Sequence, residues 1–255
     1  MERIEVKTLK ELKDSLDQLL SKQFIFRGIN DKDQLLPQLL RKNKNCPDKE
    51  FDLLKTFEKY YELYSSAHDC WEFLSIAQHY GLMTRLIDFS RNPYVALFFS
   101  LRFEKKSGCD YEIYAIDPKG KFIDKVEILK YSRDYDSLLG HVGFKTIEIE
   151  PDRSFSDTLR DIFKGSMSIK NINVIEPNLT NSRMLAQQGL FVFPDVLEKQ
   201  PIMDFFASEA TVIVIPDILR KEALEYLSKM GFDEFHLMPD LASICSEANN
   251  QALNE

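Results

Sequence analysis

Three short stretches of this sequence gather polar side chains at points where predicted strands begin or end. The first is Phe26-Arg27-Gly28, in which an arginine follows an apolar run and precedes a glycine. The planar fork of donors on an arginine suits a pyrophosphate or a carboxylate, and a glycine lets another backbone or a ligand approach closely. Arg27 is therefore a candidate anion-binding residue. The alternative is that it pairs with a local acid, Asp31 or Asp33.

The second stretch, residues 78–93, is the densest in polar groups. It carries an amide, a histidine, a tyrosine, two hydroxyl groups, two arginines and an aspartate between two predicted helices. Such density beside a buried helix favours a functional site. The alternatives are that Asp88 caps the following helix and that His79 bonds a backbone carbonyl. If residues 86–89 form a strand, Arg85 and Asp88 point to opposite faces, because side chains three apart do so.

The third stretch, residues 182–191, places two adjacent glutamines before Gly189 and the start of an apolar run. A buried amide needs hydrogen-bond partners. Gln188 therefore either locks the core or faces a pocket.

Hydrophobic periodicity predicts the elements that must position these stretches. Apolar residues at helical spacing predict helices over residues 7–21, 49–65 and 71–79, the last ended by Gly81, and Asn92-Pro93 opens a further buried helix. Short β-branched and aromatic runs predict strands over residues 24–28, 111–118, 189–194 and 210–216, followed by a helix that Asp217 caps and Gly231 ends. This mixture predicts an α+β fold with a small central mixed sheet flanked by helices.

Composition narrows the class of protein further. The 255 residues include 33 Lys plus Arg against 41 Asp plus Glu, and the net charge of −8 disfavours a protein that coats nucleic acid non-specifically. The longest apolar run, residues 95–99, is far short of the roughly 20 residues that a membrane span requires. The first residues show no signal peptide, so we expect a cytoplasmic protein with no membrane partner. The histidines and cysteines lack zinc-site spacing, so no metal is predicted.

Together the three stretches resemble the FRG domain family, which is named for the tripeptide that stands here at residues 26–28. The match continues at residues 36–41, 78–90, 92–93 and 96–99, then at Arg183, residues 186–189 and Phe191, and in the last strand and helix, which end near residues 237–241. The family usually has Pro where Met83 stands and Trp where Phe89 stands, and both replacements are tolerable in a turn or an apolar setting. The resemblance implies a single FRG-type domain over residues 1–255. Its best-matching core is 20–119, with an insert at 120–175 and C-terminal strands and helices at 176–245.

The order of the stretches is also similar to that of ADP-ribosyltransferases of the arginine-serine-glutamate type. In that likeness Phe26-Arg27-Gly28 matches the first strand, Asp88-Phe89-Ser90 matches the second, and Gln188 or a nearby acid matches the third. The likeness implies a split sheet and NAD as a substrate. The catalytic candidates are Arg27, His79, Arg85, Asp88, Gln188 and Glu209, and the candidates for binding NAD are Arg27, Gly28, Tyr80, Thr84 and Ser90.

The third position lacks the expected carboxylate. A neutral glutamine cannot stabilise a developing cation as a carboxylate does. Glu209, just before the strand at 210–216, is one candidate source of the charge. Glu148 and Glu150 are others, although an alternating strand in an acidic protein also exposes two glutamates routinely.

The resemblances imply an NAD-dependent ADP-ribosyltransferase that acts on RNA, DNA or protein, in the setting of a bacterial toxin or antiphage effector, with an antitoxin or chaperone as a further partner. Two alternatives stay open: a nuclease that uses His79, Arg85 and Asp88, and a non-enzymatic FRG module that binds a ligand or partner. The enzymatic hypothesis requires Arg27, residues 79–90 and the glutamine pair to converge on one cavity.

Overall fold

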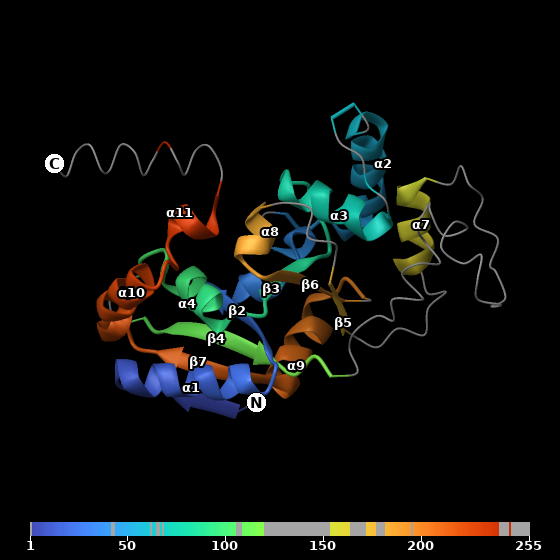
Figure 1. Ribbon diagram of the computed structural model, residues 1–255. Helices are drawn as coiled ribbons and strands as arrows, with labels where there is room; N and C mark the ends of the chain where they lie inside the picture. Colours follow the sequence, from blue (N-terminus) through green and yellow to red (C-terminus); the bar gives the residue numbers. More distant parts are fainter. Residues whose placement is uncertain are drawn as a thin grey trace, which may run out of the picture.

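A single mixed sheet organises the protein (Figure 1). The computed structural model describes residues 2–41, 44–61, 63, 64, 67, 69–105, 109–119, 154–163, 172–176, 182–194, 196–239 and 245. The strands are β1 (Glu2–Glu5), β2 (Ile25–Ile29), β3 (Ile87–Ser90), β4 (Tyr111–Ile116), β5 (Ile172–Ile175), β6 (Gly189–Pro194) and β7 (Ala210–Ile215). Their order across the sheet is β1-β7-β4-β2-β3-β6-β5. Strands and helices from one chain share this sheet, which confirms the predicted α+β class.

The sheet is weakest between β2 and β3. Strand β1 runs parallel to β7, and the other neighbours are antiparallel. Strands β2 and β3 share one paired position, Phe26 opposite Ser90, whereas each other pair of neighbours is matched over several residues. The described strands therefore form one continuous sheet with a narrow joint, rather than two separate sheets. The likeness to ADP-ribosyltransferases stays a prediction.

Five of the described helices lie where the sequence predicts them, and the four at 155–161, 182–186, 199–209 and 234–237 were not predicted. The described helices are α1 (Leu9–Ser21), α2 (Glu50–Tyr61), α3 (Cys70–His79), α4 (Pro93–Leu101), α7 (Phe155–Asp161), α8 (Ser182–Ala186), α9 (Lys199–Glu209), α10 (Arg220–Lys229) and α11 (Glu234–Leu237). Helix α4 begins where expected because the Asn92 side chain accepts a hydrogen bond from the Tyr94 N–H at 2.9 Å and Pro93 is preset for the first turn. Among the helices that the structure describes, none combines the length and apolar character needed to cross a bilayer.

Three apolar clusters hold the layers together. One face of the sheet packs against α1, α4 and α10, and the other face packs against α9 and the short 3₁₀ helix at Lys32–Leu35. The third cluster joins α2, α3 and α7 to the β5 and β6 side of the sheet, and Figure 1 shows these three helices together at one end of the molecule. The joint between β2 and β3 thus lies where the three clusters meet.

The structure corrects two details of the sequence prediction. Asp217 starts a 3₁₀ turn, Asp217–Leu219, and α10 begins after it at Arg220 without a side-chain cap. Part of the region predicted as an unclear insert, residues 120–175, forms α7 and β5. Glu148 and Glu150 lie outside the described residues.

Candidate functional site

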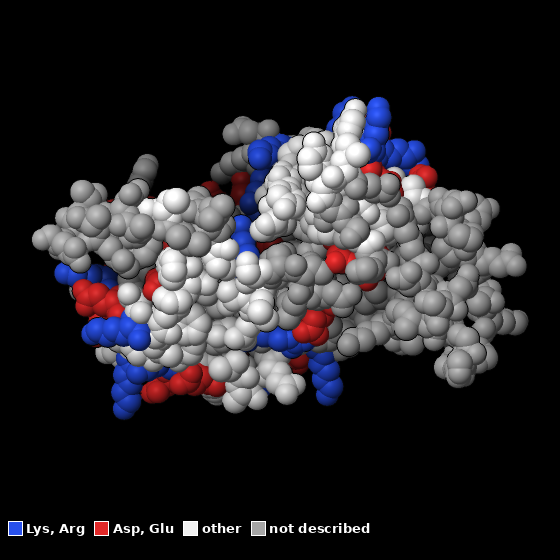
Figure 2. Space-filling view, turned by 45° about the horizontal axis from the view of Figure 1, so that its top comes forward, with Lys and Arg blue, Asp and Glu red and all other residues white. Residues whose placement is uncertain are grey.

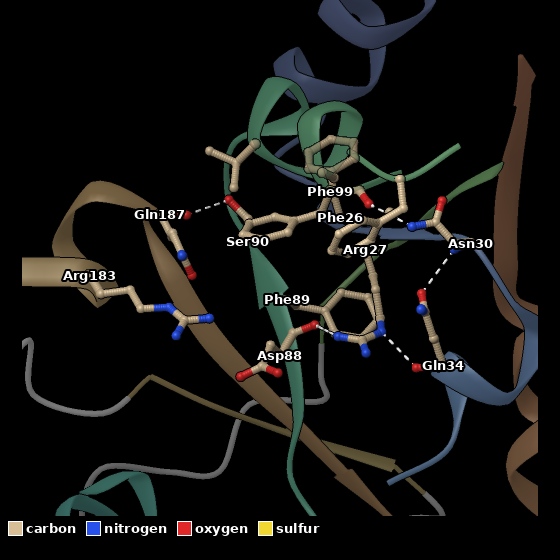
Figure 3. Close-up of a pocket in the computed structure, with 14 residues that line it drawn as sticks. Phe26, Arg27, Asn30, Gln34, Asp88, Phe89, Ser90, Phe99, Arg183 and Gln187 are labelled. Atoms are coloured by element: carbon tan, nitrogen blue, oxygen red, sulfur yellow. Dashed lines mark hydrogen bonds between the residues drawn. The ribbon is translucent and has the colours of Figure 1, made fainter. Parts of the chain in front are cut away.

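A polar cavity occupies the place where β2 and β3 separate. Beyond the pair Phe26–Ser90 the backbones are no longer matched, and the Arg27 side chain bridges the gap by donating from Nη1 to the carbonyl oxygen of Asp88 (Figure 3). The cavity beside this bridge has a volume of about 180 Å³. Its polar lining includes Arg27, Asn30, Asp88, Ser90, Arg183 and Gln187. The Arg27 side chain therefore joins the two strands in place of backbone hydrogen bonds, and the gap beside it has room for a ligand.

A second cavity adjoins the first. Its volume is about 220 Å³, and it shares Asp88, Phe89, Arg183 and Gln187 with the first cavity. His79 from the end of α3 lines it as well. We refer to these two adjoining cavities together as the cleft. Figure 2 shows Lys or Arg atoms beside acidic atoms in a hollow near the middle of one face of the molecule.

Arg27 is held by carbonyl groups rather than by the acids Asp31 or Asp33. Its Nε donates to the Gln34 carbonyl at 2.9 Å, Nη1 donates to the Asp88 carbonyl, and Nη2 donates to no described residue. The pKa of Arg27 is lowered to about 10, because the lowering by burial and, to a smaller extent, by the nearby Arg41 outweighs the raising by the Asp88 carboxylate. The guanidinium therefore stays charged at neutral pH, and it has donors left for a ligand in the cavity.

The Asp88 carboxylate is oriented by a short chain of side chains. Its Oδ1 accepts a hydrogen bond from Gln78 Nε2 at 2.8 Å, and the Gln78 Oε1 accepts one from the hydroxyl of the buried Thr84. Among the described residues that line the two cavities, Asp88 is the only acidic one. Thr84, predicted to bind NAD, positions Gln78 instead, and Asp88 is the carboxylate that the cleft offers to a substrate. Asp88 does not cap α4, because Asn92 does.

Ser90 and Gly28 line the first cavity, but their local contacts are structural. The Ser90 hydroxyl donates to the Gln187 carbonyl at 2.7 Å and accepts from the Asn92 N–H at 2.9 Å, so it ties β3 to the segments that follow α8 and precede α4. A Cβ on Gly28 would stand 1.8 Å from the Ala96 carbonyl oxygen. The close approach that Gly28 permits is therefore that of α4, which is one of the two options that the sequence left open.

Arg85 lies in the core, away from both cavities. Its Nε donates to Glu50 Oε1 at 2.9 Å, its Nη2 donates to Glu50 Oε2 at 2.5 Å, and its guanidinium carbon lies 3.6 Å from the centre of the Phe163 ring. Both side chains are almost fully buried. This bidentate pair uses the arginine to join α2 to the end of the sheet. The predicted catalytic role of Arg85 is therefore corrected to a structural one.

Three further candidates also lie outside the cleft. Gln188 is exposed and adopts a left-handed φ of 46°, and its carbonyl accepts from the Arg91 N–H at 3.1 Å. Tyr80 is 76% exposed, and Glu209 is exposed at the end of α9, next to the strand β7 that is separated from β2 by β4. None of the three belongs to the described lining of either cavity. The turn at Gln188 directs Gln187 into the cleft in its place.

His79 keeps a place at the site. It lines the second cavity together with Asp88, and its ring stands edge-on to that of Tyr80 with 5.0 Å between the ring centres. The histidine is exposed, so solvent and a ligand reach it from the same side. The structure thus brings Arg27, His79, Asp88 and Ser90 to one cleft from two distant parts of the chain.

Sequence reasoning missed Arg183 as a site residue. This arginine of α8 is partly buried and lines both cavities, and its guanidinium makes no hydrogen bond or ion pair with a described residue. In Figure 3 its side chain extends from α8 toward Asp88. The available signal was its position in the third polar stretch, where the adjacent glutamines drew attention instead.

The comparisons identify one part of the chain. Residues 22–109 match the model of the FRG domain. No curated protein and no solved structure matches the chain. The matched residues contain Arg27, Gln78 and Asp88 and end before Arg183, so they supply one wall of the cleft. Residues 22–109 of this chain are therefore similar to the FRG domain.

Proposed function

We propose that the protein is an NAD-dependent ADP-ribosyltransferase that modifies a macromolecular acceptor. One observation carries the proposal: a charged arginine with unused donors and a tethered carboxylate, Arg27 and Asp88, line the same cavity in a gap of the sheet. An arginine fork binds phosphate oxygens, and a fixed carboxylate stabilises an oxocarbenium-like centre. The two groups together match the pyrophosphate and the reacting ribose of the ADP-ribose unit that such a reaction transfers.

The reaction needs little else from the protein. Arg27 binds the pyrophosphate of NAD, and Asp88 lies beside the ribose. The bond from C1′ to the nicotinamide nitrogen breaks, and nicotinamide leaves with its electron pair. A nucleophile of the acceptor then bonds to C1′, and its proton passes to the Asp88 carboxylate. Asp88 takes the part that the sequence had assigned to Gln188 or Glu209, because neither of those residues lines the cleft.

A second candidate function rests on a different pair. His79 and Asp88 line the same cavity, and a histidine beside a carboxylate can move protons in RNA or DNA cleavage. The described residues contain no group of three His, Cys, Asp or Glu side chains placed to hold a metal ion. Arg85, the third residue assigned to the nuclease, lies in the core, so we rank this candidate second.

Labelled NAD tests the proposal directly. The protein is incubated with adenine-labelled NAD and cell lysate, and label in protein and in nucleic acid is counted separately. We expect wild-type protein to transfer label and Asp88→Asn to transfer at least about 100-fold less, because the near-isosteric amide removes the charge. Asp204→Asn is the matched control, since Asp204 also accepts from a glutamine amide, at 2.7 Å, on the exposed side of α9.

Three outcomes separate the functions. Transfer by wild type and by Asp204→Asn, but not by Asp88→Asn, supports the ADP-ribosyltransferase. Cleaved RNA or DNA without NAD consumption supports the nuclease. NAD that binds and is recovered unchanged, with RNA and DNA left intact, supports a binding module and overturns both enzymatic proposals.

A further inference from the structure

Arg183 is placed as a ligand-binding residue that the proposed reaction has not yet used. It lines both cavities, it is partly buried, and its guanidinium meets no acceptor among the described residues. Figure 3 shows Arg183 and Arg27 approaching the cavity from different sides, with Asp88 between them. A partly buried guanidinium without an acceptor keeps its donors for an anion in the cavity.

The charge balance of the cleft supports an anionic ligand. Arg27 and Arg41 both interact electrostatically with the Asp88 carboxylate, and burial lowers the pKa of each arginine. Within the described lining of the cleft, the cations are Arg27 and Arg183 and the one carboxylate is Asp88. This local excess of positive charge occurs in a chain whose net charge is −8. The cleft therefore attracts anions although the protein as a whole repels them.

The backbone that carries Arg183 is fixed on two sides. The Ser90 hydroxyl donates to the Gln187 carbonyl at 2.7 Å, and the Gln187 Nε2 donates to the Leu237 carbonyl at 2.8 Å. Met184, next to Arg183 on α8, is buried in the third apolar cluster. These anchors fix the backbone of the short helix from which Arg183 lines both cavities.

We propose that Arg183 is a second phosphate-binding residue and that it acts with Arg27 to hold the two phosphate groups of a pyrophosphate-containing ligand. The inference rests on the proposed function and deepens it by naming the part of the substrate that each arginine recognises. A single phosphate reaches one of these guanidinium groups, whereas a pyrophosphate reaches both. The cleft should therefore prefer the diphosphate unit over an isolated phosphate.

Titration calorimetry with inorganic pyrophosphate and with inorganic phosphate tests this preference without any reaction. We expect wild type to bind pyrophosphate at least about tenfold more tightly than phosphate. Arg183→Ala should weaken pyrophosphate binding by about tenfold or more and phosphate binding by less than about threefold, because Arg27 remains. Arg183→Lys should recover part of the loss, since it restores the charge without the planar fork.

Arg91→Ala is the matched control. The substitution of Arg91 also removes one positive charge close to the cleft, but the Arg91 guanidinium is already paired with Glu176 at 3.0 and 2.9 Å. We expect this variant to bind pyrophosphate within about twofold of wild type. Thermal unfolding of each variant shows whether the fold is kept, and we expect unchanged transitions because the Arg183 guanidinium has no hydrogen-bond partner among the described residues.

The inference and the proposed function fail in different ways. Equal pyrophosphate affinity for wild type and Arg183→Ala would overturn the inference, as would equal affinity of wild type for phosphate and pyrophosphate. If Arg183→Ala transfers ADP-ribose with the KM of wild type, the inference is overturned and the proposed function stands. If the pyrophosphate results are as expected and NAD is not consumed, the inference stands and the proposed function is overturned.

Discussion

Arg27 and Arg85 are both arginines of the polar stretches, the first partly buried and the second almost fully buried, and they have opposite surroundings. Arg85 meets both oxygens of Glu50 and packs on the Phe163 ring inside the cluster of α2, α3 and α7. Arg27 meets two backbone carbonyls at the edge of a cavity, and its Nη2 donates to no described residue. Arg85 has its counter-charge within the fold, whereas Arg27 has donors left for a ligand.

The comparison teaches which feature separates a structural arginine from a binding one. A buried ion pair is tolerated only when the protein itself supplies the partner and the hydrogen bonds. Where the fold supplies carbonyls and one shared carboxylate, the site retains affinity for an added anion. The acceptors around each guanidinium, more than its burial, separate the structural arginine from the binding one.

The largest expected effect concerns Glu50, the partner of Arg85. Glu50→Ala leaves a buried guanidinium without its counter-charge, so we expect the free energy of unfolding to fall by about 3–5 kcal/mol. Urea denaturation followed by circular dichroism measures this change. The double variant Glu50→Leu/Arg85→Met should recover much of the loss, because it removes both charges together. A loss below about 1 kcal/mol in Glu50→Ala would show that the pair is not the anchor described here.

Arg27→Ala should affect the reaction strongly and stability weakly, which is the reverse of Glu50→Ala. We expect ADP-ribose transfer to fall by about 100-fold, because the pyrophosphate loses a charge-assisted, two-pronged contact, while the free energy of unfolding changes by less than about 1.5 kcal/mol. Initial rates with labelled NAD and urea denaturation give the two values. Arg3→Ala, which removes an exposed arginine paired with Glu112, is the control and should leave transfer unchanged. An unchanged rate in Arg27→Ala would make Arg27 a structural residue like Arg85.

A smaller effect is expected at Gln78, which orients the carboxylate opposite Arg27. Gln78→Ala removes the 2.8 Å hydrogen bond to Asp88, and we expect about tenfold slower transfer with little change in NAD affinity. Gln200→Ala removes an equivalent amide-to-carboxylate bond on the exposed side of α9 and serves as the control. If both variants behave like wild type, the side-chain chain from Thr84 to Asp88 has no part in the reaction.

The smallest expected effect is in pH dependence. Burial lowers the pKa of Arg27 to about 10, and only the protonated guanidinium attracts a pyrophosphate. Affinity should therefore be constant from neutral pH to about 9 and fall about twofold at pH 10, where half of the free protein has lost this charge. Pyrophosphate titrations across this range, in buffers of equal ionic strength, measure the effect. Constant affinity up to pH 11 would mean that Arg27 keeps its ordinary pKa.

The sequence by itself determined the local structure and the neighbourhood of the site. Leucine spacing, the Asn92-Pro93 pair and the apolar runs predict α1, α4, β6 and β7 because periodicity and caps act within a few residues. The three polar stretches were also sufficient to predict that Arg27, Asp88 and Ser90 share one cavity, as they do. The FRG match over residues 22–109 rests on the same local patterns.

Only the tertiary structure decided which polar residues are satisfied within the fold. Glu50 stands 35 positions before Arg85, and no local pattern indicates that the two will pair. Because of the left-handed turn at Gln188, Gln187 lines the cleft in place of the predicted Gln188. The strand order places Glu209 away from the gap between β2 and β3. Arg183 reaches Asp88 because β6 pairs with β3. Partners that lie far apart along the chain are set by packing and strand pairing, and so the chemistry of the cleft emerges only when the sheet has formed.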